Sequence, residues 1–380
     1  MEMIKRVTDF NKYFDTIRQH ENIVCYGAGS KGRQTVEILR ERNIFPTAFV
    51  DGDEKRWGGD CAGLPVIGYE ELTEKYEKYC ILITCVYDNA KEIHDLLKEK
   101  GENNPVYYVC NPYKAENKFL SMEEIEHYRE ELQITYDAME DDKSREILIR
   151  FLNWKGTGDM SGLVNYTEGN WLEFFGTELL PKFDDYVYMD VGAYTGDTII
   201  RFLSFCGGKY KKIIAFEPDE ANCLEAERVI RAGRLENVEL LPTGLWMCKE
   251  EKQFFAAGNG KVYESSNLYR DVANTISVRN EVAANVTARS IVVDTLDSQI
   301  KSLTGRAILK VDALASEVPI LYGAERLIKE CRPIIIMEYG TYSKYMAETI
   351  PYLRRLHSDY KFYLRQMWTF HNSRTILYVV

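Results

Sequence analysis

Two glycine-rich turns constrain the fold of this chain most, because each follows a predicted buried strand and opens a predicted helix. The first is "GAGSKG" at 27–32 and the second lies in "DVGAYTGDT" at 190–198. Glycine has no Cβ and accepts positive φ, so such turns bring the backbone close to a ligand. Strands and helices alternate around both turns, which is typical of open parallel sheets. The sequence therefore predicts an α/β protein with two Rossmann-like, doubly wound domains.

The chain of 380 residues is long enough for both domains. We expect a front domain over residues 1–113, a linker over 114–185 and a second domain over 186–380. In the linker, Ser121 and Glu124 have the spacing of a capping box, and apolar residues then recur at helical intervals. The aromatic stretch "YTEGNWLEFFGTELLP" is interpreted as a lid over a ligand or, preferably, as a docking segment between domains.

The front turn has the G-x-G-x-x-G spacing of a dinucleotide-binding unit, and Asp51 ends the next predicted strand. These features make Gly27, Gly29, Gly32 and Asp51 a candidate nucleotide-binding site. The alternative is that the third glycine only allows helix and strand to pack closely. A nicotinamide oxidoreductase is a weaker interpretation, since no acid–base site accompanies the turn.

The second turn has a different residue spacing. It reads Asp190-x-Gly-x-x-x-Gly, and Glu217 follows at the end of the next predicted strand. This is the pattern of class I S-adenosylmethionine enzymes, in which the second acid accepts hydrogen bonds from ribose hydroxyls. The alternative is that Asp190 only caps a turn. The candidate cofactor residues are Asp190, Gly192, Ala193, Thr195, Gly196, Asp197, Glu217 and Pro218.

Several segments in the second half occur in the order found in one family. They are "DVGAYTGDT", "FEPDEANCLEAERVI", "NVELLPTGLW", "VVDTLDSQI" and "ILKVDALASEVPILYGAERLIKECRPIIIME". Together they resemble the FkbM family of methyltransferases over about residues 165–340. The resemblance implies a class I methyltransferase fold and methyl transfer from S-adenosylmethionine to a hydroxyl. The front domain resembles the Rossmann-like domain of bacterial sugar O-acyltransferases. That resemblance implies a nucleotide sugar, or no identifiable ligand, at Gly27, Gly29, Gly32 and Asp51.

One stretch departs from the family pattern. Where the family reads Asp-x-Glu-Gly-x-Glu, this chain reads "DALASE", with Leu314 and Ala315 in place of the inner Glu and the Gly. Leucine cannot deprotonate a hydroxyl, and alanine is strained if the turn needs positive φ. Three explanations stay open: Asp312 or a neighbour supplies the base, the substrate differs, or the domain binds cofactor without catalysing.

Three carboxylates are the catalytic candidates. Asp312 is the first choice as base, because it ends a predicted strand; Glu338 ends the next strand and is the second. Glu317 either orients substrate or faces solvent at a helix start, where the helix dipole favours an acid. Lys310 is expected to pair with an acid. The loop 264–267, "ESSN", is a further candidate for contact with substrate or adenine.

Composition limits the partners. A net charge of −11 without a basic block argues against nucleic acid. Nine cysteines without C-x-x-C and five scattered histidines give no metal site, so no metal is expected. No apolar run is long enough to span a membrane and no signal peptide is evident, which predicts a cytoplasmic protein. A homodimer remains open.

The main hypothesis is an S-adenosylmethionine-dependent O-methyltransferase acting on a hydroxyl of a sugar, nucleotide sugar or surface glycan precursor, in polysaccharide biosynthesis. The alternative is a non-catalytic protein that binds a nucleotide sugar or cofactor and carries a degenerate methyltransferase domain.

Overall fold

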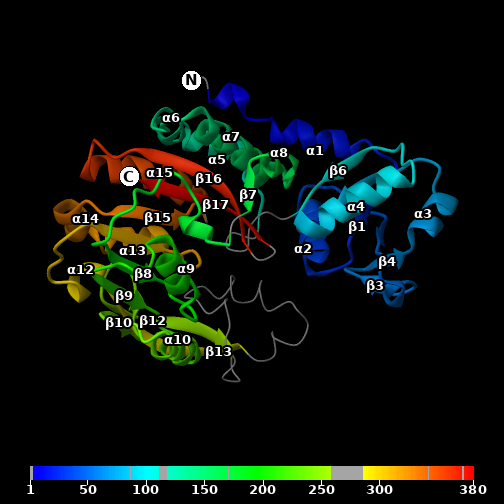
Figure 1. Ribbon diagram of the computed structural model, residues 1–380. Helices are drawn as coiled ribbons and strands as arrows, with labels where there is room; N and C mark the ends of the chain where they lie inside the picture. The colour runs from blue at the N-terminus through cyan, green and yellow to red at the C-terminus, as the bar shows by residue number, and fades with distance from the viewer. Residues whose placement is uncertain are drawn as a thin grey trace. The chain divides into compact units, whose positions relative to one another are not determined.

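The computed structural model describes residues 3–85, 87–110, 118–169, 171–257, 286–340, 342–369 and 372–380. The described chain forms two compact units. The front unit comprises the chain up to Arg129 together with Glu146–Thr167, and the rear unit comprises Glu130–Arg145, Glu168–Thr369 and Arg374–Val380. Figure 1 draws the front sheet in blue and cyan and the rear sheet in green, orange and red. The predicted boundaries near 113 and 185 stay predictions, and the linker helices divide between the two units.

The front unit is built on one six-stranded sheet with the order β3-β4-β2-β1-β5-β6. All its pairs are parallel except β3 with β4. The strands are β1 (Ile23–Tyr26), β2 (Ala48–Val50), β3 (Asp60–Cys61), β4 (Leu64–Ile67), β5 (Cys80–Ile83) and β6 (Val106–Tyr108). The helices are η1 (Ile4–Arg6), α1 (Phe10–Arg18), α2 (Ser30–Glu41), η2 (Glu54–Arg56), α3 (Tyr69–Lys75) and α4 (Tyr87–Glu99).

Successive residues of β1 point into different cores, which shows that both faces of the front sheet are covered. Cys25 packs with Phe14 and Leu39 from α1 and α2, whereas Val24 packs with Leu72 and Leu97 from α3 and α4. The period of two in a strand produces this division, and burial on both faces explains why the strand is almost wholly apolar. The predicted doubly wound front domain is confirmed.

The linker is helical, as predicted, and its capping box at Ser121 and Glu124 is present with both reciprocal hydrogen bonds. The elements are α5 (Met122–His127), α6 (Arg129–Asp137), α7 (Asp142–Thr157), α8 (Ser161–Val164), β7 (Thr167–Gly169) and η3 (Glu173–Phe175). In the rear unit, Arg365 is 2 % exposed and bonds to Asp141 (Nη2 to Oδ2, 2.7 Å) and Ser144 (Nη1 to Oγ, 3.1 Å). Part of the linker is therefore anchored on the rear sheet.

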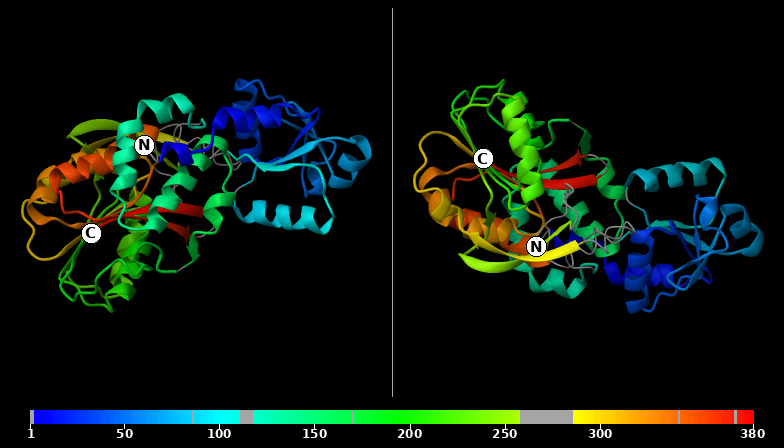
Figure 2. Two further views of the ribbon diagram at one scale, coloured as in Figure 1. Left: turned by 90° about the horizontal axis from the view of Figure 1, so that it is seen from above. Right: turned by 90° about the horizontal axis from the view of Figure 1, so that it is seen from below.

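The rear sheet has eight strands in the order β10-β9-β8-β14-β15-β17-β16-β7. The strands from β10 to β15 are parallel, and β17 enters antiparallel beside β15. The red strands β16 and β17 lie side by side in both views of Figure 2. β17 lies inside the sheet, between β15 and β16, and β7 lies beyond β16. The predicted class I methyltransferase fold is confirmed.

The rear strands and helices have the following bounds. The strands are β8 (Val187–Val191), β9 (Lys212–Phe216), β10 (Val238–Leu241), β14 (Ala307–Val311), β15 (Ile334–Glu338), β16 (Phe362–Thr369) and β17 (Asn372–Val379). The helices are α9 (Asp197–Phe205), α10 (Glu220–Ala232), α12 (Leu296–Gln299), α13 (Glu317–Tyr322), α14 (Glu325–Cys331) and α15 (Ser343–Leu356). A separate three-stranded sheet, not predicted, joins β11 (Gly244–Leu245), β13 (Val286–Asp294) and β12 (Glu250–Ala257).

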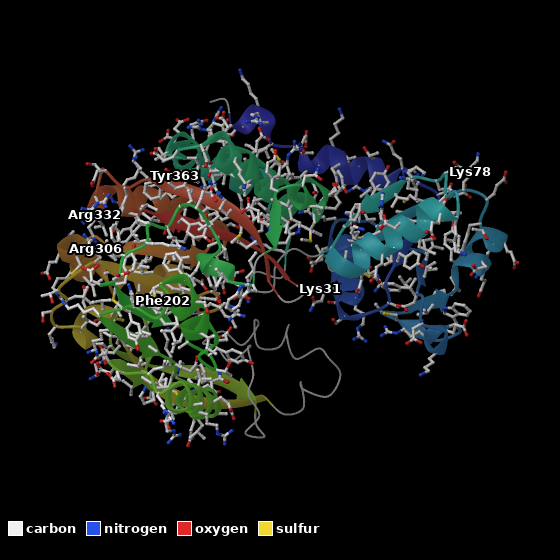
Figure 3. The ribbon with its side chains drawn as sticks, in the orientation of Figure 1. Lys31, Lys78, Phe202, Arg306, Arg332 and Tyr363 are labelled. Atoms are coloured by element: carbon white, nitrogen blue, oxygen red, sulfur yellow. The ribbon has the colours of Figure 1, made fainter. Side chains whose placement is uncertain are left out.

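Aromatic side chains fill the rear core. Phe202 on α9, labelled in Figure 3, stacks on Tyr188 of β8 with ring centroids 4.3 Å apart. Phe174 and Phe175 pack in the same core, so part of the aromatic segment before Asp190 belongs to the rear core. Docking between domains stays a prediction for this segment. Within the described residues, no helix combines the length and the apolar character needed to cross a membrane.

Candidate functional site

The turn after β8 is shaped by close contacts that only glycine allows. Gly192 has φ +75°, and a Cβ there would lie 2.0 Å from the carbonyl oxygen of Asp312. Gly196 has φ +81° and begins α9. The Gly192 turn therefore packs directly against the end of β14, and any larger side chain at 192 would force the two strand ends apart.

Asp190 lies beneath this turn and is fully buried. Its Oδ1 is 3.0 Å from Lys310 Nζ, and its Oδ2 accepts a 2.6 Å hydrogen bond from Thr198 Oγ1. The β8–β14 register explains the ion pair, since Lys310 is directly opposite Asp190. Burial alone would lower the pKa of the Lys310 amine, but Asp190 and Asp312 outweigh it and the pKa is raised. Both oxygens of Asp190 are thus engaged within the protein, and its role as a cofactor ligand stays a prediction.

Lys310 also ties the pair to the turn itself. Its Nζ donates to the carbonyl oxygen of Gly192 over 2.8 Å. The sequence predicted an acidic partner for this lysine, and the structure identifies it as Asp190. A buried ion pair with additional hydrogen bonds fixes one arrangement of the surrounding backbone. Lys310 and Asp190 together hold the Gly192 turn in place.

Glu217 follows β9 and reaches back to the same turn. Its Oε2 accepts a 3.0 Å hydrogen bond from the backbone N–H of Tyr194, and its Oε1 accepts one of 2.9 Å from Asp219 N–H. Burial raises the pKa of Glu217 to about 7. Its Oε1 also accepts a 3.4 Å hydrogen bond from Asn222 Nδ2. Oε2 is therefore the oxygen with a lone pair left for a ribose hydroxyl.

The remaining predicted cofactor residues surround this turn. Ala193 is buried and its N–H donates to Phe216 O, while Asp197 starts α9 and pairs with Arg201. Thr195 is partly exposed in the turn. Pro218 lines a hollow of about 470 Å³ that is also bordered by Pro242 and Arg289.

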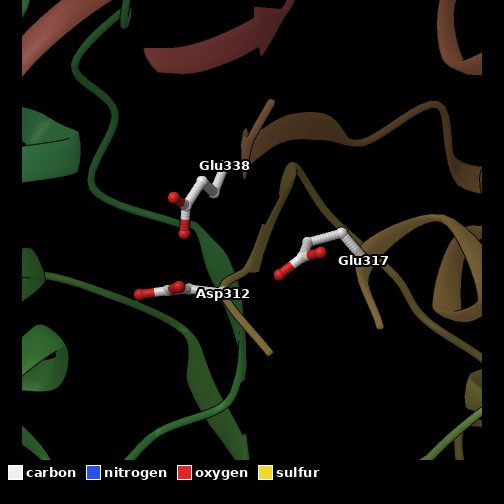
Figure 4. Close-up of side chains that lie close together, drawn as sticks. All are labelled: Asp312, Glu317 and Glu338. Carbon is white, nitrogen blue, oxygen red and sulfur yellow. The ribbon is translucent and has the colours of Figure 1, made fainter. Parts of the chain in front are cut away.

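The three predicted catalytic carboxylates come together at the carboxyl ends of β14 and β15 (Figure 4). Asp312 follows β14, Glu338 ends β15 and Glu317 begins α13, and one oxygen of each lies within 4.8 Å of the others. The β14–β15 register pairs Val311 with Met337, so Asp312 and Glu338 come next on neighbouring strands. An oxygen cluster of this kind can bind hydroxyl groups or a hard cation in principle, but Asp312 already has a cationic partner.

That partner is Arg374 on β17, which sequence reasoning missed. Arg374 Nη1 donates to Asp312 Oδ2 over 2.8 Å. Burial alone would raise the pKa of Asp312, but Arg374 and Lys310 outweigh it and hold the pKa below its ordinary value. No local signal marks Arg374, because an antiparallel strand from the end of the chain brings it here.

The pKa of Glu317 is shifted in the opposite direction from that of Asp312. It is 2 % exposed, and its Oε1 accepts backbone hydrogen bonds from Ala313 N–H (3.1 Å) and Ala315 N–H (3.2 Å). Burial and the neighbouring Glu338 raise the pKa of Glu317 to about 8. It does not face solvent, which removes one of the two sequence interpretations. The two pKa shifts therefore run in opposite directions, favouring the ionised form of Asp312 and the protonated form of Glu317.

The altered residues of "DALASE" both adopt left-handed backbone. Leu314 has φ +38° and Ala315 has φ +75°. The turn thus needs positive φ where the family has glycine, and the alanine is strained there. The candidate loop at 264–267 lies outside the described residues.

In the front unit, the predicted residues support the turn. Asp51 Oδ2 accepts a 2.8 Å hydrogen bond from Ala28 N–H. A Cβ at Gly32 would lie 2.0 Å from Gly27 O, so Gly32 allows helix and strand to pack closely. Gly29 precedes α2 without a side-chain cap. A nucleotide-sugar site at these residues stays a prediction.

The fold is that of a class I methyltransferase domain, and three carboxylates lie together at one edge of its sheet. Residues 190–363 match the family model described as the methyltransferase FkbM domain. Methyl transfer is therefore the general reaction that this part of the chain supports.

Among solved structures, the chain is similar to the methyltransferase FkbM from Methylobacillus flagellatus KT, with 19 % identity, a TM-score of 0.71, and coverage of 98 % of this chain and 94 % of that chain. An rRNA methylase from Streptococcus thermophilus matches at 15 % identity and TM-score 0.30, covering 52 % of this chain and 86 % of its own. A precorrin-6y C5,15-methyltransferase from Geobacter metallireducens GS-15 matches at 11 % identity and TM-score 0.32, covering 55 % and 85 %. The first of these supports the fold alone. No curated protein matches the chain.

Proposed function

We propose that the rear unit is an S-adenosylmethionine-dependent O-methyltransferase acting on a hydroxyl of a sugar, nucleotide sugar or surface glycan precursor. One observation carries the proposal: the Gly192 turn packs on the peptide of Asp312, and Asp312 lies beside Glu317 and Glu338. The predicted cofactor residues and the predicted acceptor residues thus share one edge of one sheet. Ligands of doubly wound folds bind at this edge.

The residues present suit the cofactor. Gly192 and Gly196 give a turn that a ligand can approach closely, and Glu217 Oε2 keeps a lone pair for a ribose hydroxyl. Asp190 is too deeply engaged with Lys310 to be a free partner for the cofactor's ammonium group, so we assign it to holding the turn. The cofactor, when bound, would supply a methyl group already activated on a sulfonium.

The protein's own contribution is to orient the acceptor and to receive its proton. Positioning reacting atoms about 3 Å apart can supply roughly 7–11 kcal/mol of a barrier reduction. Asp312 is the group in the right protonation state, because Arg374 holds it ionised. A base with a depressed pKa accepts a proton weakly, so we expect positioning to contribute more than proton transfer. Glu317 and Glu338 would hold the acceptor through its hydroxyl groups.

The alternative function also has an observation behind it. Leu314 replaces the family's inner glutamate, and Ala315 adopts a strained left-handed conformation. A domain that kept its fold and lost catalysis would look like this. We place the protein in the cytoplasm and in polysaccharide biosynthesis as part of the same proposal. Its acceptor is a small molecule or glycan rather than nucleic acid, and a homodimer is an open proposal.

The first experiment is calorimetric titration of S-adenosylmethionine and S-adenosylhomocysteine into the full chain and into Glu217→Gln. Micromolar binding that weakens at least tenfold in the variant supports cofactor use. Absence of binding to folded protein contradicts the proposal. Formation of S-adenosylhomocysteine with UDP-glucose or UDP-N-acetylglucosamine as acceptor then separates the enzyme from the non-catalytic alternative.

Leu314→Glu, with Leu314→Gln as its control, tests the altered position directly. If the missing carboxylate limits the rate, only the glutamate variant accelerates product formation. If neither variant accelerates it, the three carboxylates already present supply what the reaction needs.

A further inference from the structure

A cavity of about 270 Å³ lies in the front unit, at the carboxyl ends of β5 and β6. Cys85, just after β5, and Cys110, just after β6, line it together with helix α4 and the corner between α7 and α8. The carboxyl edge of a doubly wound sheet is where ligands bind. None of the four residues predicted as the nucleotide-sugar site lines this cavity.

The space beside the Gly27 turn, where the sequence predicts a ligand, is partly filled by the side chain of Cys85. An ideal Cβ on Gly27 would lie 2.2 Å from Cys85 Sγ, so Cys85 packs against the Gly27 turn where β1 and β5 end. The open space lies on the other side of Cys85, one strand further along the same edge. The space that could hold a ligand therefore lies towards β6 rather than at the Gly27 turn.

The floor of the cavity is apolar and rich in sulfur. Ala90, Met160 and the two thiols line it. Burial raises the pKa of Cys85 to about 12 and also raises that of Cys110, so both thiols are neutral. Such a floor disfavours a charged group, because burying a charge without a partner is costly. Sulfur atoms instead make favourable contacts with flat rings, of about 0.3–1.5 kcal/mol each.

The mouth of the cavity is polar but balanced in charge. Lys91 Nζ lies 2.8 Å from Asp95 Oδ2, and both side chains are exposed. His94 and Tyr108 also line the cavity, and their ring planes are 31° apart with centroids 6.2 Å apart. Paired charges and an imidazole can exchange hydrogen bonds with hydroxyl groups without selecting an anion. The volume of about 270 Å³ lies just below the roughly 300–1,000 Å³ of pockets for drug-sized ligands, which favours a small ligand such as a flat ring joined to one sugar.

We propose that this cavity binds a nucleoside, with the base on the sulfur-rich floor and the ribose hydroxyls at the mouth near Lys91 and Asp95. The proposal does not depend on the function assigned to the rear unit. It differs from a site at Gly27, Gly29, Gly32 and Asp51, since it needs no phosphate.

The test is calorimetric titration of the full chain with uridine, cytidine and guanosine. Adenosine is left out because it is part of the cofactor proposed for the rear unit. Ser161→Trp places a bulky ring at the mouth from an exposed position, so folding is not stressed, and Ala90→Phe fills the floor. Leu96→Phe, on the exposed side of α4 and outside the cavity, is the matched control.

We expect at least one nucleoside to bind, both filling variants to weaken binding at least tenfold, and Leu96→Phe to leave it unchanged. The proposal is overturned if no nucleoside binds to the folded protein, or if binding survives in Ser161→Trp. It is also overturned if UDP binds while uridine does not and Asp51→Asn abolishes the binding, because the Gly27 turn would then be the site.

Discussion

Arg374 and Asp312 form an ion pair that joins β17 to the end of β14, with 2.8 Å between Nη1 and Oδ2. The two residues are 62 positions apart in sequence. The pair sets the protonation state of the predicted base, since Arg374 and Lys310 hold the pKa of Asp312 low against the effect of burial. Arg374 is therefore a positioning residue for the reaction proposed here.

Arg374→Gln should slow methyl transfer roughly 10²-fold at neutral pH, because Asp312 loses the partner that fixes its position and a misplacement of about 1 Å can cost that much. Without the guanidinium the pKa of Asp312 rises, so the acidic limb of the pH–rate profile should move to higher pH. Arg374→Lys should restore part of the rate and return the limb towards its original position. Equal loss of S-adenosylmethionine affinity in both variants would instead indicate a general structural role.

The sequence predicted the two doubly wound domains because glycine turns, buried strands and helices follow each other locally. It also predicted the three carboxylates, since each lies at a strand end or helix start and parallel strands end at one edge. Arg374 could not be found this way. Its position depends on β17 entering the sheet antiparallel between β15 and β16, and that pairing is set by distant contacts.

The role of the glycines in the front turn could not be predicted from the sequence either. The spacing of Gly27, Gly29 and Gly32 is compatible with ligand binding and with close helix packing. Only the coordinates show that Gly32 faces the Gly27 carbonyl and that Cys85 packs on Gly27. The left-handed backbone at Ala315 could be suspected from the family's glycine, but alanine itself gives no such signal.

Ala315→Gly should relieve strain in the turn that carries Glu317. Left-handed backbone costs an L-residue roughly 1–2 kcal/mol, and glycine's extra freedom in the unfolded chain offsets about 0.5–1 kcal/mol of that gain. We expect the free energy of unfolding in urea to rise by up to about 1 kcal/mol. Ala324→Gly is the matched control: Ala324 is fully buried with φ −116°, so glycine should destabilise there. A loss of stability in both variants would contradict the inference that Ala315 is strained.

Glu217 should make cofactor binding depend on pH. Its pKa is raised to about 7 by burial, and the ionised carboxylate is the better acceptor for ribose hydroxyls. The affinity for S-adenosylmethionine should rise up to about tenfold between pH 6 and pH 8. Glu217→Gln should bind more weakly and with little dependence on pH. Calorimetry across this pH range measures the affinity of both proteins. A wild-type affinity that does not change with pH would show that the Glu217 carboxylate does not contact the cofactor.

The same group should affect stability with a definite sign. The folded-state pKa of Glu217 lies above its ordinary value, so its contribution is fully present below about pH 4.5 and is lost as pH rises through about 7. The difference should be on the order of 3 kcal/mol. Glu317 acts in the same direction up to about pH 8. The measurement is therefore the difference between wild type and Glu217→Gln across pH, which isolates Glu217.

Lys310→Met should be the most destabilising change near the site. It leaves Asp190 buried without its cation, and breaking one side of a buried pair costs about 3–5 kcal/mol. The Gly192 carbonyl also loses its 2.8 Å donor, so the cofactor turn should loosen. The double variant Lys310→Met with Asp190→Asn should recover much of the stability, because no unpaired charge remains. If the double variant is no more stable than Lys310→Met alone, the lysine matters through its hydrogen bonds to the turn rather than through the ion pair. Urea unfolding of the wild type and the two variants distinguishes these outcomes.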